Sequence, residues 1–231
     1  MADVEKIKRL FARLTPTRAA LMQRALDLRT RKIIVVLEDI FQSHNASAVL
    51  RSCDAFGIQE VHAIENNNKL RVFGGVDMGA SKWLDIHRYT LSEARRRRYE
   101  PRMIASSPEA AENTRAALQR LKNRGYLLAA STLRKDAIDI SEVPVDKPLA
   151  LMIGTELTGL SETAHEMADI KFSLQMSGFV QSLNLSVFCA VCLSAIASKM
   201  RATTDDWKLS ENEKSELLED WLTRCFVDKE V

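Results

Sequence analysis

Two common phosphate-binding loops are missing from this sequence, which is also poor in glycine and proline. Glycine supplies only eight and proline five of its 231 residues. No G-x-x-x-x-G-K-[ST] segment occurs, and no G-x-G-x-x-G follows an apolar run. Both loops cradle phosphates with backbone N–H groups, so their absence argues against ATP hydrolysis and against ordinary dinucleotide binding.

Long apolar runs are missing as well. No uninterrupted apolar stretch approaches the ~18 residues of a transmembrane helix. The first residues, MADVEKIKRLF, lack the apolar block of a secretory signal. We therefore expect no membrane span and a cytoplasmic location, in which cysteines stay reduced. The four cysteines are Cys53, Cys189, Cys192 and Cys225.

No spacing typical of a metal site occurs. The pair Cys189-x-x-Cys192 lies in an apolar stretch, where cysteine is usually a small core residue. The histidines are scattered along the chain as His44, His62, His87 and His165. We therefore expect no metal.

Charge is balanced overall but unevenly placed. The chain carries 33 basic and 31 acidic side chains. Residues 1–32 carry nine Lys or Arg against three Asp or Glu, whereas residues 203–231 carry four against nine. A basic N-terminal segment is typical of a protein that binds a polyanion. The solvated face of an amphipathic helix explains the same pattern equally well.

The apolar pattern predicts the fold class. Several short runs rich in β-branched residues show no polar alternation, which is typical of strands buried on both faces of a parallel sheet. We expect strands at 32–37, 61–64, 83–89, 126–130, 149–153 and 170–174. Helices are predicted between them at 45–56, 110–124, 161–169 and 182–200. This alternation predicts an α/β fold with a mostly parallel sheet flanked by helices.

Helical extensions are expected at both ends of this domain. Two helices are predicted at 4–13 and 17–28, and a last one at 211–225. We therefore divide the chain into a basic, RNA-binding extension at 1–31, a main domain at 32–201 and a tail at 202–231.

Three polar segments follow predicted strands. In open α/β sheets ligands bind at the carboxyl ends of strands, so these segments are the candidate site. The first reads N-x-S-A-x-x-R, from Asn45 to Arg51. The second reads G-x-E-x-x-G, from Gly154 to Gly159, and the third reads S-L-N-x-S, from Ser182 to Ser186.

Together and in this order, the three segments resemble the signature motifs of the SPOUT class, in its SpoU branch of RNA ribose 2′-O-methyltransferases. The resemblance covers most of residues 1–225 and is closest to the enzymes that modify guanosine 18 of tRNA. It implies a deep C-terminal trefoil knot at about 149–200. It also implies a homodimer that transfers a methyl group from S-adenosylmethionine to a guanosine ribose in the tRNA D-loop.

Two alternatives to this function stay open. A ribosomal RNA 2′-O-methyltransferase of the same branch would share the motifs, although such enzymes often carry a compact N-terminal RNA-binding domain. Only about forty residues precede the first motif here. The other alternative is a catalytically silent RNA-binding protein of this fold, against which the intact Arg51, Glu156 and Asn184 argue.

The resemblance also assigns roles to single residues. Arg51 matches the family's catalytic arginine, and Asn45, Glu156, Ser182 and Asn184 are expected to orient Arg51 and the substrate. A guanidinium group stays protonated in proteins. We therefore expect Arg51 to bind a phosphate and to stabilise developing alkoxide charge rather than to act as a base.

Each of these residues also has an ordinary structural explanation. Asn45 and Ser182 are suitable helix N-caps. Arg51 has potential ion-pair partners in Asp54 and Glu38. Each motif alone is therefore weak, and only the ordered set favours catalysis.

Binding residues are carried over from the family in the same way. In the family the cofactor is held largely by backbone groups of the knot, and the matching positions are Ser131, Gly154, Leu174, Met176 and Leu183. For RNA, the basic N-terminal segment and one further lysine give Arg9, Arg13, Arg18 and Lys82.

The sequence departs from the family pattern at three places. Gln175 stands where proline is common, which predicts a looser cofactor loop. Ser81 replaces a residue that is often histidine. Residues 91–112, which include the run Arg95–Arg98, predict an insertion. These departures leave the reaction type unchanged and bear on the choice of RNA.

Overall fold

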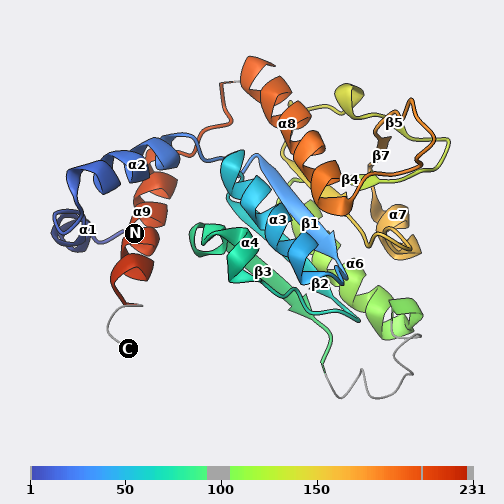
Figure 1. Ribbon diagram of the computed structural model, residues 1–231, viewed down its shortest axis with the longest axis horizontal. Coiled ribbons are helices and arrows are strands. Elements are labelled where there is room, and N and C mark those ends of the chain that lie inside the picture. Colours follow the sequence, from blue (N-terminus) through green and yellow to red (C-terminus); the bar gives the residue numbers. More distant parts are fainter. Residues whose placement is uncertain (1, 93–104, 204, 228–231) are drawn as a thin grey trace.

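The computed structural model describes residues 2–92, 105–203 and 205–227 (Figure 1). Within these ranges, seven parallel strands form one sheet in the order β3-β2-β1-β6-β4-β7-β5. They are β1 (Ile33–Glu38), β2 (Glu60–Glu65), β3 (Asp85–Thr90), β4 (Leu127–Ser131), β5 (Ile138–Asp139), β6 (Leu149–Ile153) and β7 (Ile170–Ser173). The predicted parallel α/β fold is confirmed.

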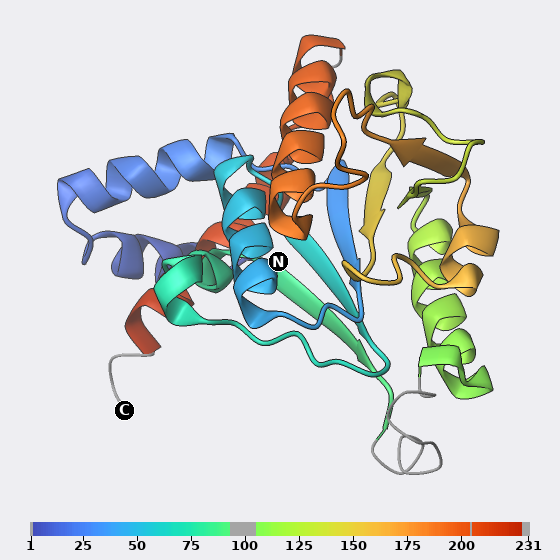
Figure 2. The ribbon, with the colours of Figure 1, turned by 45° about the vertical axis from the view of Figure 1, so that its right-hand side comes forward.

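Helices cover both faces of this sheet (Figure 2). Successive side chains of β1 point to opposite faces. The odd-numbered ones pack with α3 (Ser43–Ala55) and α8 (Leu185–Thr203), and the even-numbered ones pack with α6 (Pro108–Asn123) and α7 (Glu162–Met167). Because both faces are covered, all six residues of β1 are buried, which is why its sequence shows no polar alternation.

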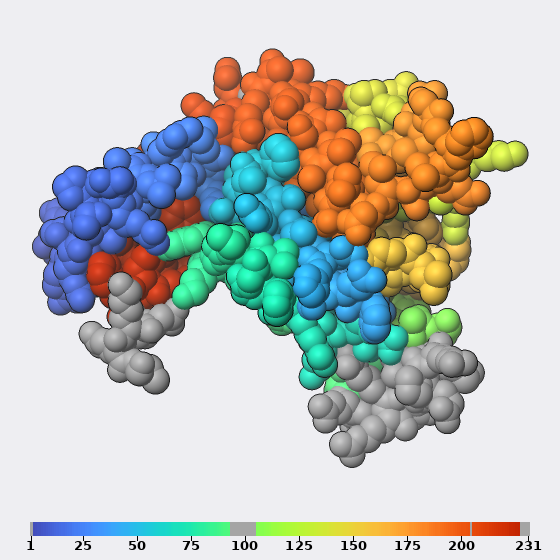
Figure 3. All heavy atoms as spheres, viewed as in Figure 1, coloured from blue at the N-terminus to red at the C-terminus, as the bar shows by residue number. Residues whose placement is uncertain are grey.

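The two ends of the chain form a helical unit with its own hydrophobic cluster (Figure 3). In this unit α1 (Val4–Phe11) and α2 (Pro16–Asp27) pack against α9 (Glu211–Val227). Acidic and basic groups meet across it: Lys6 lies 2.9 Å from Glu219. The two extensions therefore lie side by side, and part of the N-terminal positive charge is neutralised within the chain. The exact domain boundaries stay a prediction.

Most predicted elements are confirmed, with two corrections at helix starts. Helix α3 begins at Ser43, so Asn45 lies inside its first turn and is not its N-cap. Helix α8 begins at Leu185, which leaves Ser182 in the preceding loop. Gly57 follows the end of α3 in the left-handed region, with a φ of 77° that suits glycine.

Four short elements were missed by the sequence analysis. They are α4 (Gly74–Asp77), β5 and two 3₁₀-helices, η1 (Ala80–Trp83) and η3 (Ile140–Glu142). Each spans four residues or fewer. Such short segments complete too little of a helical or strand period to give a sequence signal.

Helix α8 is, by length and composition alone, apolar enough to cross a membrane. The expectation that no segment reaches this limit is wrong, because serines such as Ser194 and Ser198 interrupt the run of apolar residues without making the helix polar on average. One face of α8 packs against α3 in the core, and this face includes Cys189 and Cys192. Both thiols are free and buried, as the core interpretation predicted.

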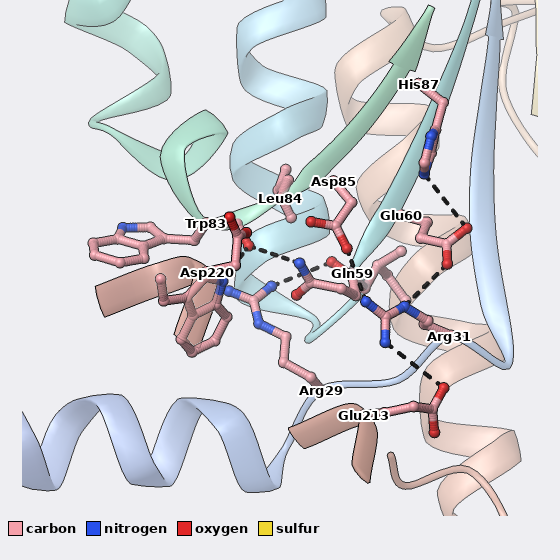
Figure 4. Close-up of polar contacts among 12 residues, drawn as sticks. Arg29, Arg31, Gln59, Glu60, Trp83, Leu84, Asp85, His87, Glu213 and Asp220 are labelled. Atoms are coloured by element: carbon pink, nitrogen blue, oxygen red, sulfur yellow. Dashed lines mark hydrogen bonds and ion pairs between the residues drawn. The ribbon is translucent and has the colours of Figure 1, made fainter. Parts of the chain in front are cut away.

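An ion-pair network joins the sheet to the helical unit (Figure 4). Arg31 Nε lies 3.0 Å from Oε1 of Glu60, the first residue of β2. The other guanidinium nitrogens of Arg31 lie 2.9 Å from Asp85 and 3.6 Å from Glu213 on α9. Arg124, at the end of α6, contacts the same Glu60 carboxylate at 2.8 Å. The buried carboxylate of Glu60 is therefore held between two guanidinium groups.

We predict that Glu60 loses its stabilising effect in acid. Burial by itself raises the pKa of Glu60, but hydrogen bonds from His62 and Arg124 outweigh it and lower the pKa to about 2. A carboxylate with a lowered pKa stabilises the folded state above its ordinary pKa of 4.5 and loses that effect as the pH falls toward 2. The free energy of unfolding should therefore be higher for the wild type than for Glu60→Gln above pH 4.5.

Urea denaturation at a series of pH values measures this difference. The gap between the two proteins should shrink from pH 4.5 to pH 2. Glu166→Gln, at an exposed position of α7, is the matched control and should change stability by less than about 0.5 kcal/mol throughout. A Glu60→Gln gap that stays constant with pH contradicts the prediction.

Candidate active site

The three polar segments lie at one edge of the sheet. They follow β1, β6 and β7 in the sequence. Strand β6 pairs with β1, and only β4 separates β6 from β7. Since all these strands are parallel, their carboxyl ends share one edge, as the sequence analysis expected.

Asn45 connects the three segments through its side-chain amide. It is buried on the first turn of α3. Its Nδ2 donates to Glu156 of the second segment, and Asn184 Nδ2 of the third donates to Asn45 Oδ1 at 3.1 Å. Gln42 Oε1 also accepts from Asn45, at 3.0 Å. An amide both donates and accepts, so one buried side chain links three segments that are far apart in the sequence.

Asn184 rather than Ser182 caps helix α8. Its Oδ1 accepts from the backbone N–H of Ser186 at 2.9 Å and from the Ser186 hydroxyl at 2.6 Å. The cap interpretation is therefore wrong for Ser182, and it is also wrong for Asn45. Asn184 combines a helix cap with a contact to the first segment.

Ser47 holds the first segment against the loop that follows β2. Its hydroxyl is fully buried, donates to the Ser43 carbonyl at 2.7 Å and accepts from the backbone N–H of Phe73 at 2.7 Å. Nearby, Asp39 accepts from the backbone N–H of Asn66 at 2.7 Å. The serine in N-x-S-A-x-x-R therefore connects α3 to the neighbouring loop and does not line the cavity described below.

Arg51 lies on a different side of α3 from Asn45. Residues six apart on an α-helix differ by about 120° around its axis. The Arg51 side chain is exposed, and it makes no hydrogen bond or ion pair with the residues that the structure describes. Asp54 pairs with Arg29, and Glu38 is hydrogen-bonded to α6 and to the residue before α7. The surface ion-pair explanation is therefore wrong for Arg51, whose guanidinium is available to a substrate.

The second segment forms a closed loop that depends on its two glycines. Thr155 and Gly159 exchange backbone hydrogen bonds of 3.0 and 3.1 Å. A Cβ atom on Gly154 would lie 2.1 Å from the backbone carbon of Gly159, so no side chain fits there. Gly159 has a φ of 70°, in the left-handed region. The loop presents Glu156 toward Asn45 and Leu157 to solvent.

A cavity of about 590 Å³ lies beside this loop. Ser131, Gly154 and Leu183, three of the five predicted cofactor positions, line it. Leu174 and Met176 do not line it. Glu156 and Ser182 of the predicted catalytic set are also in its wall. His165 of α7, which sequence reasoning missed, is there too, and a lone histidine on a short helix gives no signal that would have found it.

Comparison with known proteins agrees with this geometry. The model of the SpoU rRNA Methylase family matches residues 32–110 and 106–194. The chain belongs to the SpoU methylase family.

Relatives with established names span nearly the whole chain. The tRNA (guanosine(18)-2′-O)-methyltransferase of Borreliella burgdorferi is 34% identical over 88% of this chain and 84% of its own. The enzyme of the same name from Thermus thermophilus is 33% identical over 91% and 98%. The crystal structure of the TrmH/SpoU tRNA modifying enzyme of Aquifex aeolicus has a TM-score of 0.71 at 27% identity, covering 96% of this chain and 99% of that one.

Gln175 makes a local hydrogen bond through its backbone N–H. Proline, which is common at this position in SpoU enzymes, could not make this bond. The backbone N–H of Gln175 donates to Asp139, whose pKa is lowered by hydrogen bonds from Ser141 first and from Gln175 as well. Proline has no N–H to donate. This bond connects the loop after β7 to the residues around β5. It therefore opposes the loosening of the loop that the sequence predicted from the lack of proline.

A second cavity, of about 480 Å³, lies at the edge of the helical unit. We call it the basic cavity; its wall includes Arg13, Arg18, Lys82, Trp83, Arg224 and Phe226. The Arg13 guanidinium lies 4.2 Å from the Phe226 ring centre and that of Arg18 lies 5.2 Å from Trp83. Arg9 is exposed on α1 but does not line the cavity. The run Arg95–Arg98 lies outside the described residues.

Two of the four histidines come together in the fold. His62 and His87 stack on neighbouring strands with ring centres 4.6 Å apart, and their ligand atoms lie within 4.8 Å of a Glu60 oxygen. The separation of these two histidines along the sequence therefore does not persist in the fold. The Glu60 carboxylate is already bound by Arg31 and Arg124, whose positive charges oppose a metal cation. The arrangement of these three residues is explained by the ion pairs of Glu60, and we do not propose a metal site there.

We predict that Gly154→Ala disrupts the loop of the second motif. The new methyl group would overlap the backbone at Gly159, so the loop must shift, at a cost of about 1–3 kcal/mol or more in the free energy of unfolding. Gly178→Ala is the matched control, because a Cβ atom there meets nothing within 4 Å. Urea denaturation compares the two variants, and equal stabilities contradict the prediction.

Proposed function

We propose that the chain transfers a methyl group from S-adenosylmethionine to the ribose 2′-oxygen of guanosine 18 in tRNA, in the cytoplasm. The observation that carries this proposal is the hydrogen-bonded link Glu156–Asn45–Asn184, which joins all three SpoU motifs beside the 590 Å³ cavity. The names of the relatives from Borreliella burgdorferi and Thermus thermophilus favour tRNA. The family description refers to ribosomal RNA, which stays the alternative substrate.

The cavity fits the proposed cofactor. Its volume lies within the ~300–1,000 Å³ usual for small-molecule sites. Backbone groups of Gly154 and Leu183 in its wall are the proposed holders. One buried polar atom in this wall, Nδ1 of His165, has no hydrogen-bond partner in the described part of the chain. When bound, the cofactor supplies an electrophilic methyl group on a sulfonium centre.

Alignment and charge stabilisation are then the tasks of the protein. Arg51 stays protonated, so we assign it to a phosphate next to the target ribose and to the negative charge that develops on the 2′-oxygen. Its planar fork can donate two parallel hydrogen bonds to one phosphate. We assign Glu156, Asn184 and Ser182 to the orientation of the ribose, with Asn45 as the side chain that holds the first two in place.

We further assign the trefoil knot of the SPOUT class to residues 149–200 and propose that a second copy of the chain packs against this region. Leu157 and Phe179, in the loops of the second and third motifs, are 94% and 109% exposed. Val187 and Val191 add apolar surface on α8. Large exposed apolar side chains of this kind are typical of an interface. A homodimer would bury them next to the site.

The basic cavity is the proposed contact with the tRNA backbone. Arg13 and Arg18 stack on aromatic rings and form no ion pair within the described part of the chain, so both remain positively charged toward solvent. Lys82 adds a third cation, and Arg9 extends the surface along α1. Nucleic-acid affinity comes largely from neutralised phosphates, which this set of side chains can supply.

Mapping of ribose methylation tests the proposed function directly. Purified protein is incubated with an unmodified tRNA transcript and S-adenosylmethionine, and the product is digested and analysed by mass spectrometry. We expect one 2′-O-methyl group, at guanosine 18, and none on a transcript with that guanosine replaced. Methylation of ribosomal RNA alone would favour the alternative substrate, and no methylation of either RNA would favour a silent RNA-binding protein.

We predict that Arg51→Ala abolishes methyl transfer. Removal of one transition-state interaction typically costs ~10²–10³ in rate. Arg51→Lys should fail as well, because lysine keeps the charge but lacks the planar fork. A tritiated-methyl assay measures turnover, with calorimetric binding of S-adenosylhomocysteine as the check that folding and the cavity are intact. Near-normal turnover of Arg51→Ala on tRNA contradicts the assignment.

We also predict that the basic cavity sets part of the salt dependence of tRNA binding. Combined replacement of Arg9, Arg13 and Arg18 by alanine should weaken binding and flatten the slope of log K against log salt by roughly 0.7–0.9 for each phosphate that is no longer neutralised. Fluorescence anisotropy over a range of salt concentrations measures this slope. Arg115→Ala, at an exposed position of α6, is the control and should leave it unchanged. An unchanged slope in the triple variant would move RNA binding elsewhere.

A further inference from the structure

His165 is a buried imidazole without a partner among the described residues, and it borders the 590 Å³ cavity, which we call the motif cavity. It lies on α7, is 8% exposed and lines the cavity wall. Its Nδ1 is fully buried without a hydrogen bond, and no partner of its ring is found in the described part of the chain. A buried polar group without a partner loses its hydrogen bonds to water and gains none in return, which destabilises the folded state. A cost of this kind is common where a ligand completes the hydrogen bond.

The position of His165 is fixed by the anchored first turn of α7. Ser161, one turn earlier, caps α7 and is held by Glu38, whose carboxylate accepts from the Ser161 backbone N–H at 2.7 Å and from its hydroxyl at 2.8 Å. The backbone N–H of His165 donates to the Ser161 carbonyl at 3.1 Å. The ring is therefore placed on a rigid turn anchored to β1, and not on a loose loop.

The imidazole is kept neutral at its site. Burial lowers the pKa of His165, and the charge of Arg134 lowers it further, with a smaller contribution from Lys171. Glu162 and Asp136 act in the opposite direction. A neutral imidazole offers one donor and one acceptor, which is the pattern that pairs with the edge of a nucleobase.

The cavity has a charged rim and an apolar floor. At the rim Arg134 and Glu162 form an exposed ion pair. In the floor Ile153 and Leu160 are 3% and 6% exposed. The charged amino-acid end of S-adenosylmethionine is compatible with the rim, whereas its flat adenine ring is compatible with the floor, where His165 is buried.

We propose that His165 hydrogen-bonds the adenine base of the cofactor and thereby positions it in the cavity. This inference rests on the proposed function, since it requires that the cavity binds an adenosyl compound. His165 is a positioning residue for the cofactor and takes no part in the transfer itself. Its contact would be the same in substrate and product forms of the cofactor.

Calorimetric titration separates this contact from a structural effect. S-adenosylhomocysteine and free adenosine are titrated into the wild type, His165→Leu and His165→Gln. We expect His165→Leu to bind both ligands about tenfold more weakly, because both contain the adenine base. His165→Gln keeps an amide that donates and accepts, so it should recover most of the affinity. His87→Leu, remote from the cavity, is the matched control and should bind as the wild type does.

Thermal unfolding of the free proteins adds a readout that a structural role would change in the opposite sense. Removal of an unpartnered buried polar group should leave the melting temperature of His165→Leu unchanged or higher. If His165→Leu melts at a lower temperature and its loss of affinity is comparable to its loss of stability, His165 serves packing and the inference is overturned. Normal binding of both ligands by His165→Leu would overturn it as well, and weaker binding confined to S-adenosylhomocysteine would place the contact on the amino-acid end instead.

Nitrogen-15 NMR of labelled histidine reports the contact directly. The chain has only four histidines, and the His165→Leu spectrum identifies the signal of interest. Saturating S-adenosylhomocysteine should shift the His165 ring nitrogens while leaving them in the neutral form. An unshifted signal with bound ligand would overturn the inference and leave the proposed function standing. No binding of S-adenosylhomocysteine by the wild type would overturn the proposed function itself.

Discussion

The buried amide of Asn45 is the interaction on which the candidate site depends. It receives a hydrogen bond from Asn184 and donates one to Glu156, so it joins a helix after β1 to loops after β6 and β7. Burial makes these bonds consequential, because an amide left unpaired in the interior costs free energy. The three segments therefore hold each other in place, and the glycines of the second segment let the backbone of its own loop close tightly.

Arg51 stands apart from this hydrogen-bonded group. It is exposed on another side of α3, while the basic cavity lies at the edge of the helical unit formed by both ends of the chain. Figure 1 shows α3 over the sheet and the helical unit to one side of it. The acidic α9 neutralises part of the N-terminal charge, whereas Arg13 and Arg18, which border the basic cavity, stack on aromatic rings. Arg13 and Arg18 therefore agree with the RNA contact proposed for the basic cavity.

Sequence reasoning located the strands because their burial on both faces leaves an uninterrupted apolar pattern. It also located the three motifs and the order in which they follow the strands. It failed where a residue's role depends on distant partners. Asn45 was compatible with a helix cap, but α3 begins two residues earlier and the Asn45 amide bonds to Glu156 and Asn184 instead. The stacking of His62 on His87 and the cavity contact of His165 have no counterpart in local spacing.

By itself, the sequence determined the α/β class, the parallel strands and the membership of a family defined by three short motifs, since each of these depends on local composition and spacing. The tertiary structure alone decided that one amide connects the motifs, that Arg51 has neither Asp54 nor Glu38 as a partner, and that the two ends of the chain pack into one helical unit. These features arise from contacts between residues that lie 25 or more positions apart in the sequence. Hydrogen bonding and burial fix such contacts only once the sheet order has brought the segments together.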